Sequence, residues 1–136
     1  MTTTTTTNEK TMTDDQIKWT LTHQADVAKR RYEETQTAFL AAVQTNPADA
    51  IDWRSDDMAK AQARHEVWAM IERELAEHEP AEVLARNLAE CRNRALSFCG
   101  GGSSTSAFSN AVARARAAAL VREAEQIEGM MKSFGM

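Results

Sequence analysis

Residues 13–47 read TDDQIKWTLTHQADVAKRRYEETQTAFLAAVQTNP, and this stretch decides the fold class. Its first four letters fit a capping box, which satisfies the free amide groups at the start of an α-helix. The dipeptide Asn46-Pro47 ends the helical pattern and can begin another helix. We therefore predict a helix over about residues 14–44. Apolar or small side chains recur along it every three or four residues, as on one helical face: Ile17, Leu21, Ala25, Ala28, Tyr32, Thr35, Phe39 and Ala42.

Three further segments follow the same periodicity. Residues 48–53 are compatible with a short helical turn, and Ser55 is a candidate cap for the longer helix that follows. Pro80 interrupts the pattern, and either a turn or a kinked continuation fits there. The run CGGGSSTS at residues 99–106 predicts a loop, since glycine tolerates the left-handed dihedrals found just past a helix. The three predicted helices cover about residues 55–77, 80–98 and 106–132.

Composition supports a single helical domain. The chain has 136 residues with two prolines and five glycines, so few residues interrupt its helices. Six consecutive threonines near the N-terminus bury too little apolar surface to offset their ordering entropy. We predict an all-α antiparallel bundle of about four amphipathic helices over residues 13–136, preceded by a disordered Thr-rich tail over residues 1–12.

Charge, cysteine content and hydropathy limit the binding partners and the cellular compartment that we expect. The net charge of −4 argues against general nucleic-acid binding, which depends on neutralising phosphates with Lys and Arg. Two cysteines form no disulfide framework, which favours a reducing compartment. No stretch approaches 18 apolar residues, and the first residues lack the apolar core of a secretory signal. We therefore expect a cytoplasmic protein that does not span a membrane.

Basic residues flank the predicted Gly/Ser loop. An antiparallel hairpin would bring them to one end of the molecule, next to a helix N-terminus whose amide groups attract anions. The pattern of a nucleotide-binding P-loop is absent. We favour a flexible connector with solvated arginines and keep an anion or nucleic-acid site as the alternative. The candidate residues are Arg92, Arg94, Arg114, Arg116, Ser104 and Ser106.

Two tryptophans and an alanine-rich stretch are candidate interface residues. Trp19 lies off the apolar stripe of its helix and Trp53 lies in the connection after it, so each either anchors an interface or covers the edge of the core. Ala115, Ala118 and Ala119 would let another helix approach closely. The last helix is therefore either central in the bundle or one half of a homodimer seam.

No residues support catalysis or cofactor binding strongly. The His and Cys spacings match no zinc pattern, so we expect neither a metal nor another cofactor. Glu74 and Glu77 provide only half of the paired-glutamate pattern of helical phosphohydrolases. A Gly-x-Ser-x-Gly nucleophile elbow is absent.

The favoured function is a small non-enzymatic module that binds another protein or itself, as in small regulators or accessory proteins of the phage or mobile-element type. The first alternative is a nucleic-acid-associated regulator that uses the basic end around Arg92, Arg94, Arg114 and Arg116. The second alternative is a metal-dependent helical phosphohydrolase.

Overall fold

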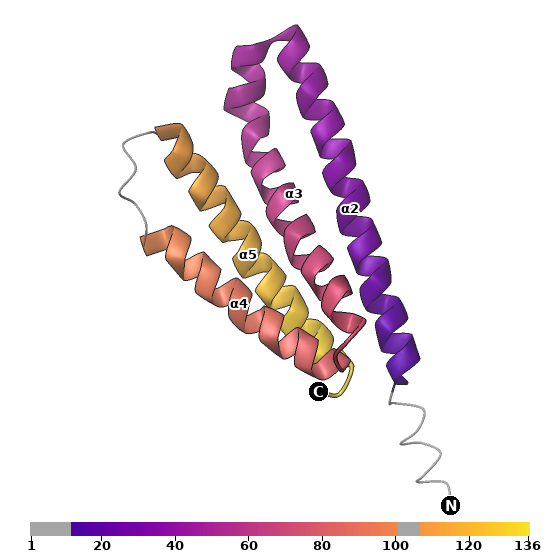
Figure 1. Ribbon diagram of the computed structural model, residues 1–136. Coiled ribbons are helices and arrows are strands. Elements are labelled where there is room, and N and C mark those ends of the chain that lie inside the picture. Colours follow the sequence, from indigo (N-terminus) through magenta and orange to yellow (C-terminus); the bar gives the residue numbers. More distant parts are fainter. Residues whose placement is uncertain (1–11, 101–106) are drawn as a thin grey trace, which may run out of the picture.

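The chain folds into four α-helices (Figure 1), in a computed structural model that describes the backbone of residues 12–100 and 107–136 and the side chains of residues 12–97 and 110–136. The described part contains no strand, which confirms the predicted all-α class. Residues 1–11 of the tail predicted over residues 1–12, and the loop serines Ser104 and Ser106, lie outside the described residues. Met12, which we assigned to the tail, instead packs partly buried against the core. The helices are α2 (Asp14–Thr45), α3 (Pro47–Leu75), α4 (Pro80–Gly100) and α5 (Ala107–Ser133).

Side-chain caps fix where α2 begins and where it turns into α3. The Thr13 hydroxyl accepts a hydrogen bond from the Gln16 amide at 3.2 Å, and the Gln16 side chain accepts one from the Thr13 amide at 2.9 Å. The predicted capping box is therefore confirmed. Asn46 then serves both helices: its amide donates to the Ala42 carbonyl at 2.8 Å, and its side chain accepts from the Asp49 amide at 3.4 Å. A single residue thus separates two antiparallel helices.

The start of the second helix was predicted wrongly. It begins at Pro47 and not at residue 55, because Asn46 caps it and proline at the first helical position is already set to a helical φ. Ser55 is not a cap: its hydroxyl donates to the Ile51 carbonyl inside the helix. The second junction is a turn and not a kink, since α3 ends at Leu75 and α4 begins at Pro80.

The helices form two antiparallel hairpins, α2–α3 and α4–α5 (Figure 1). α3 packs against both α2 and α5, and α4 packs mainly against α5. The two hairpins converge at the end that holds the α3–α4 turn and diverge toward the other end. There the α2–α3 hairpin extends beyond α4 and α5.

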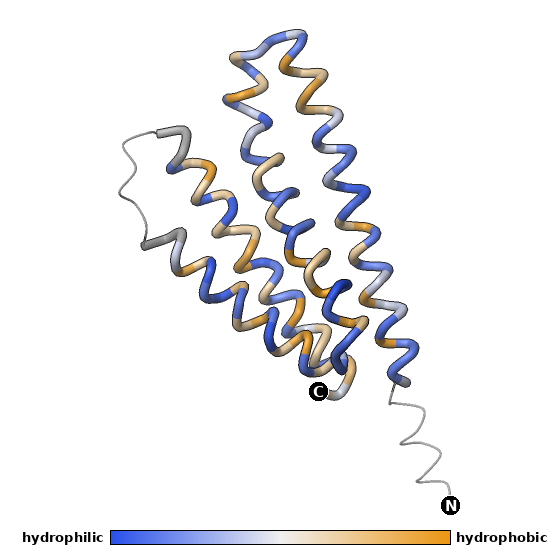
Figure 2. Tube along the Cα trace, viewed as in Figure 1, coloured by the Kyte–Doolittle hydropathy of each residue, from blue (hydrophilic) through white to orange (hydrophobic). Residues whose placement is uncertain are grey.

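The core lies at the convergent end. Hydrophobic and hydrophilic residues alternate along each helix (Figure 2), so one face of each is available for packing. Beyond Ala28 no residue of α2 is buried, and Tyr32 and Phe39 are only half-buried. The main core cluster therefore ends where the hairpins separate, and the residues buried beyond it are small ones such as Ala50 and Ala59 of α3. Its largest fully buried side chains include Trp68, Leu21, Ile71, Leu84, Leu120 and Ile127.

Candidate ligand-binding groove

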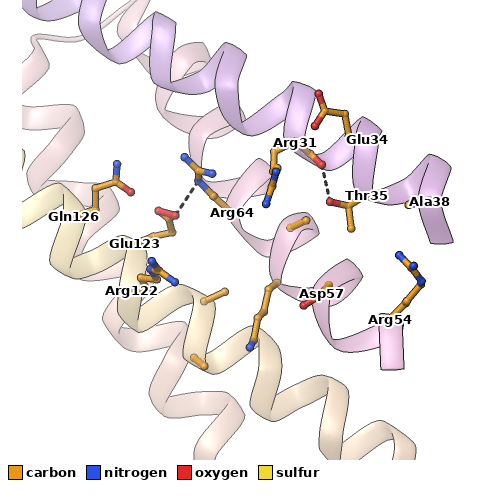
Figure 3. A pocket seen from close by; sticks show the side chains of 14 residues that line it. Arg31, Glu34, Thr35, Ala38, Arg54, Asp57, Arg64, Arg122, Glu123 and Gln126 are labelled. Carbon is orange, nitrogen blue, oxygen red and sulfur yellow. Dashed lines mark hydrogen bonds and ion pairs between the residues drawn. The ribbon is translucent and has the colours of Figure 1, made fainter. Parts of the chain in front are cut away.

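A groove of about 730 Å³ opens where the hairpins diverge (Figure 3). It lies between α2 and α5, and α3 contributes residues to it as well. Pockets of 300–1,000 Å³ are typical of ligand sites in proteins. The space is therefore large enough to hold part of another molecule, and three helices supply its lining.

A buried carboxylate lies at the inner side of this groove. The Glu123 side chain is only 5% exposed. Its Oε2 accepts a hydrogen bond from Trp68 Nε1 at 3.3 Å. Its Oε1 lies 3.1 Å from Arg64 Nε, which is an ion pair (Figure 3). The Arg64 Nε–H is not aimed at that oxygen and makes no hydrogen bond with any described residue. Core and groove therefore meet at Glu123.

The electrostatics of Glu123 reflect two opposing effects. Burial disfavours the charged form and raises the pKa of the carboxyl above its usual value. The charge of Arg64, the hydrogen bond from Trp68 and the charge of Arg122 each lower the pKa, but by less in sum. The carboxyl group therefore keeps its proton to a higher pH than an exposed glutamate does.

The outer part of the groove carries excess positive charge. Five cationic side chains and three carboxylates line the groove as a whole, although the chain has a net charge of −4. Lys60 pairs with Asp56 at 3.3 Å. Arg31, Arg54 and Arg122 are exposed, come from three different helices, and form no ion pair with any described carboxylate. The groove is therefore locally positive on a chain that is negative overall.

Small and amide side chains shape the rest of the groove. Gln126 of α5 donates to Gln24 of α2 at 3.4 Å, which bridges the two walls near the packed end. Alanines from all three helices lie among the charged residues and leave room for close approach. They are Ala38, Ala61, Ala118 and Ala119.

The predicted basic end is largely neutralised within the chain. Of its four arginines only Arg114 is exposed without a described ion-pair partner. Arg114 lies one helical turn before the groove residue Ala118 but does not itself line the groove. The others are held by carboxylates: Arg92 by Glu128, Arg94 by Glu66 at 3.5 Å, and Arg116 by Glu66 at 2.6 Å.

The two candidate tryptophans are both exposed but lie near opposite ends of the α2–α3 hairpin. Trp19 is 68% exposed and stacks on His23 with 5.3 Å between ring centroids, near the start of the helix. Trp53 is 77% exposed and lies inside α3, just after the α2–α3 corner, and not in a connection between helices as predicted. They therefore cannot belong to one small patch. Trp53 directly precedes the groove residue Arg54 in α3.

The alanines predicted as a seam divide into two groups. Ala115 and Ala119 are 4% and 8% exposed within a single chain. Ala118 is exposed and lines the groove. α5 packs against α3 and α4, whereas α3 packs against all three other helices and is the more central one. The homodimer seam stays a prediction, and Ala118 is its accessible member.

Metal-ligating residues do not gather in the described part of the chain: no three His, Cys, Asp or Glu side chains lie together there. Glu74, half of the predicted phosphohydrolase pattern, pairs with Arg86 at 2.8 Å. Cys91 is buried on the apolar face of α4, and burial, followed by the charge of Glu123, raises the pKa of its thiol to about 11.

Sequence reasoning missed the groove but had one signal for it. Leu120, Glu123 and Ile127 follow steps of three and four, so a carboxylate occupies a core position of the last helix. The unpaired arginines carry no such signal, because they are far apart in the sequence and meet only in the folded chain.

Comparison with known proteins gives no relative, since the chain matches no protein-family model, curated protein or solved structure. Among the described helices, none combines the length and apolar character needed to cross a bilayer. The function proposed below therefore depends on the groove itself.

Proposed function

We propose that the protein is a non-enzymatic helical interaction module that binds a segment of a partner protein in the groove between α2, α3 and α5. The observation that carries this proposal is the opening of the bundle at the groove. In a four-helix bundle each helix packs on two neighbours. At the level of the groove α2 and α5 are separated, and the position between them can take one more helix.

The groove suits a protein better than a nucleic acid. Nucleic-acid sites depend on an almost uniform positive surface that neutralises successive phosphates. Here Glu34 and Asp57 lie among the arginines, and Glu123 lies beneath them. A protein partner can match such mixed charge with complementary charged pairs, which set specificity, and the alanines let a helix approach closely.

Large apolar side chains are also exposed near the α2–α3 corner. Leu40, Ile51 and Trp53 are 54%, 46% and 77% exposed. Large apolar residues, and tryptophan above all, are enriched among the residues that dominate binding energy at protein interfaces. The free end of the α2–α3 hairpin therefore supports a protein partner.

Site-specific photo-cross-linking in cells tests this function. A benzoylphenylalanine replaces Ala118 in the groove or, as a matched control, Ala85, an exposed alanine on α4. We expect a discrete cross-linked product from position 118 and not from position 85. A product of twice the chain mass would identify the partner as a second copy. Equal products from both positions, or none from position 118, would contradict the proposal.

A further inference from the structure

The three unpaired arginines of the groove point to the chemistry of its ligand. Arg31 on α2, Arg54 on α3 and Arg122 on α5 line one hollow, and none lies within ion-pair distance of a described carboxylate, although the charge of Arg122 acts on Glu123 from farther away. Figure 3 shows Arg31 and Arg122 on either side of the Arg64–Glu123 pair, with Arg54 farther along α3. The cations thus follow the groove in an extended row.

Gathering like charges raises the electrostatic energy of the folded chain. An anion bound among them removes that repulsion and gains charge-assisted hydrogen bonds. Guanidinium groups bind carboxylates and phosphates through two parallel N–H donors. The ligand that fits this groove therefore carries oxyanions at more than one position.

The spacing of charge favours carboxylates on a helix over a phosphate chain. A phosphate chain would bring Glu34 and Asp57 against closely spaced negative charges. A helix presents side chains at i and i+4 about 6 Å apart, so its carboxylates can meet the arginines and leave other positions for Glu34 and Asp57. Its backbone can approach the alanines closely. The volume accommodates about two turns of a helix about 10 Å wide.

We propose that the groove binds an acidic α-helix of the partner, seated between α2 and α5 with its carboxylates on Arg31, Arg54 and Arg122. This inference rests on the proposed function and specifies the partner's chemistry. Such a helix would pack against α2, α3 and α5 where α2 and α5 are separated, on the side of the bundle that α4 does not line.

The test uses the full chain and three probes: a Glu/Ala helical peptide, a Lys/Ala helical peptide of equal length, and inorganic polyphosphate. We expect the Glu/Ala peptide alone to bind, to gain helical circular dichroism on binding, and to bind more weakly as salt rises. The double variant Arg31→Gln/Arg122→Gln should lose about tenfold or more in affinity.

The matched control is Arg30→Gln/Arg73→Gln, which removes two exposed arginines outside this groove and reaches the same net charge. We expect its affinity to stay near that of the unchanged chain. Equal loss in both double variants would overturn the proposal, as would preferred binding of polyphosphate or the Lys/Ala peptide, or a bound Glu/Ala peptide that stays non-helical. A cross-link from position 118 to a partner segment without acidic residues would overturn it while supporting the proposed function. Binding of the Glu/Ala peptide without any cross-link from position 118 would support the acidic ligand and overturn the proposed function.

Discussion

Trp68 Nε1 donates a hydrogen bond to Oε2 of Glu123 across 3.3 Å and thereby joins α3 to α5 directly beneath the groove. Trp68 is fully buried and Glu123 is 4% exposed. A buried carboxylate without donors has a large desolvation cost, so this bond and the ion pair to Arg64 make its position tolerable. The charged groove is thus connected to the packed core by one hydrogen bond.

Replacing Trp68 with phenylalanine should lower the free energy of unfolding by about 2–3 kcal/mol. The change removes a hydrogen bond to a charged group and leaves a small cavity. Urea denaturation at neutral pH measures the loss. The control is Trp19→Phe, which alters an exposed ring and should change stability by no more than about 0.5 kcal/mol. Equal effects of the two substitutions would contradict the role of the Trp68 bond.

The raised pKa of Glu123 predicts the direction in which the stability of the chain changes with pH. The folded chain holds this proton more tightly than the unfolded chain does. The protonated carboxyl therefore makes its full contribution to stability below the usual pKa of about 4.5. That contribution is lost as pH rises through the pKa of the folded chain. The variant Glu123→Gln cannot titrate. The stability of the unchanged chain relative to this variant should therefore fall as pH rises above about 4.5, which urea denaturation at a series of pH values will show.

Glu128 provides a control of opposite sign. A hydrogen bond from Arg92 and its charge lower the pKa of the Glu128 carboxyl. Its contribution is therefore present above the usual pKa and lost as pH falls. Relative to Glu128→Gln, the unchanged chain should gain stability as pH rises. If the stability of Glu123→Gln, Glu128→Gln and the unchanged chain varies with pH in parallel, neither carboxyl has the shifted pKa assigned to it.

Much of the fold could be predicted because it is local. The threefold and fourfold spacing of apolar residues, the capping box at Thr13 and the break at Asn46-Pro47 act within a few residues of one another. The wrong start at Ser55 arose from the same local reasoning. Serine before two aspartates is typical of a cap, but the helix had already begun at Pro47 and continued through it.

The groove could not be predicted because it depends on how the two hairpins diverge. No local pattern sets that angle, and Arg31, Arg54 and Arg122 are brought together only by the packing of three helices. The ion pairs of the basic end could not be predicted for a related reason. An antiparallel hairpin predicts that its arginines share one end, but the sequence does not show that Glu66 and Glu128, elsewhere in the chain, pair with three of them.

Glutamate at Ala115 and at Ala118 should affect the fold very differently. Ala115 is 4% exposed, so Ala115→Glu would bury a charge without a designed partner and should cost about 3 kcal/mol or more. Ala118 is exposed to the groove, and Ala118→Glu should change stability by about 0.5 kcal/mol at most. Urea denaturation compares them. A strongly destabilised Ala118→Glu chain would mean that this position is packed and not open.

Cys91 should resist thiol reagents in the folded chain. Its side chain is buried, and a pKa of about 11 in place of 9.0 lowers the thiolate fraction at pH 8 by about a hundredfold. In a Cys99→Ser background, thionitrobenzoate release from Cys91 should be slow in buffer and fast in urea. Equal rates in the two solvents would show that the α4 face opens readily.

Replacing His65 with phenylalanine should stabilise the chain by up to about 1 kcal/mol. His65 stacks on Tyr32 with ring centroids 4.9 Å apart and planes at 7°, while its Nδ1 is buried without a hydrogen-bond partner among the described residues. Phenylalanine keeps a flat ring against Tyr32 and removes the unsatisfied nitrogen, whose desolvation opposes folding. His65→Ala removes both features and should destabilise the chain, because α2 and α3 then lose the stacked pair. The urea midpoints of the two variants test this prediction. If His65→Phe destabilises the chain as much as His65→Ala does, the Nδ1 nitrogen contributes to stability. Stacking alone would then not explain why histidine occupies this position.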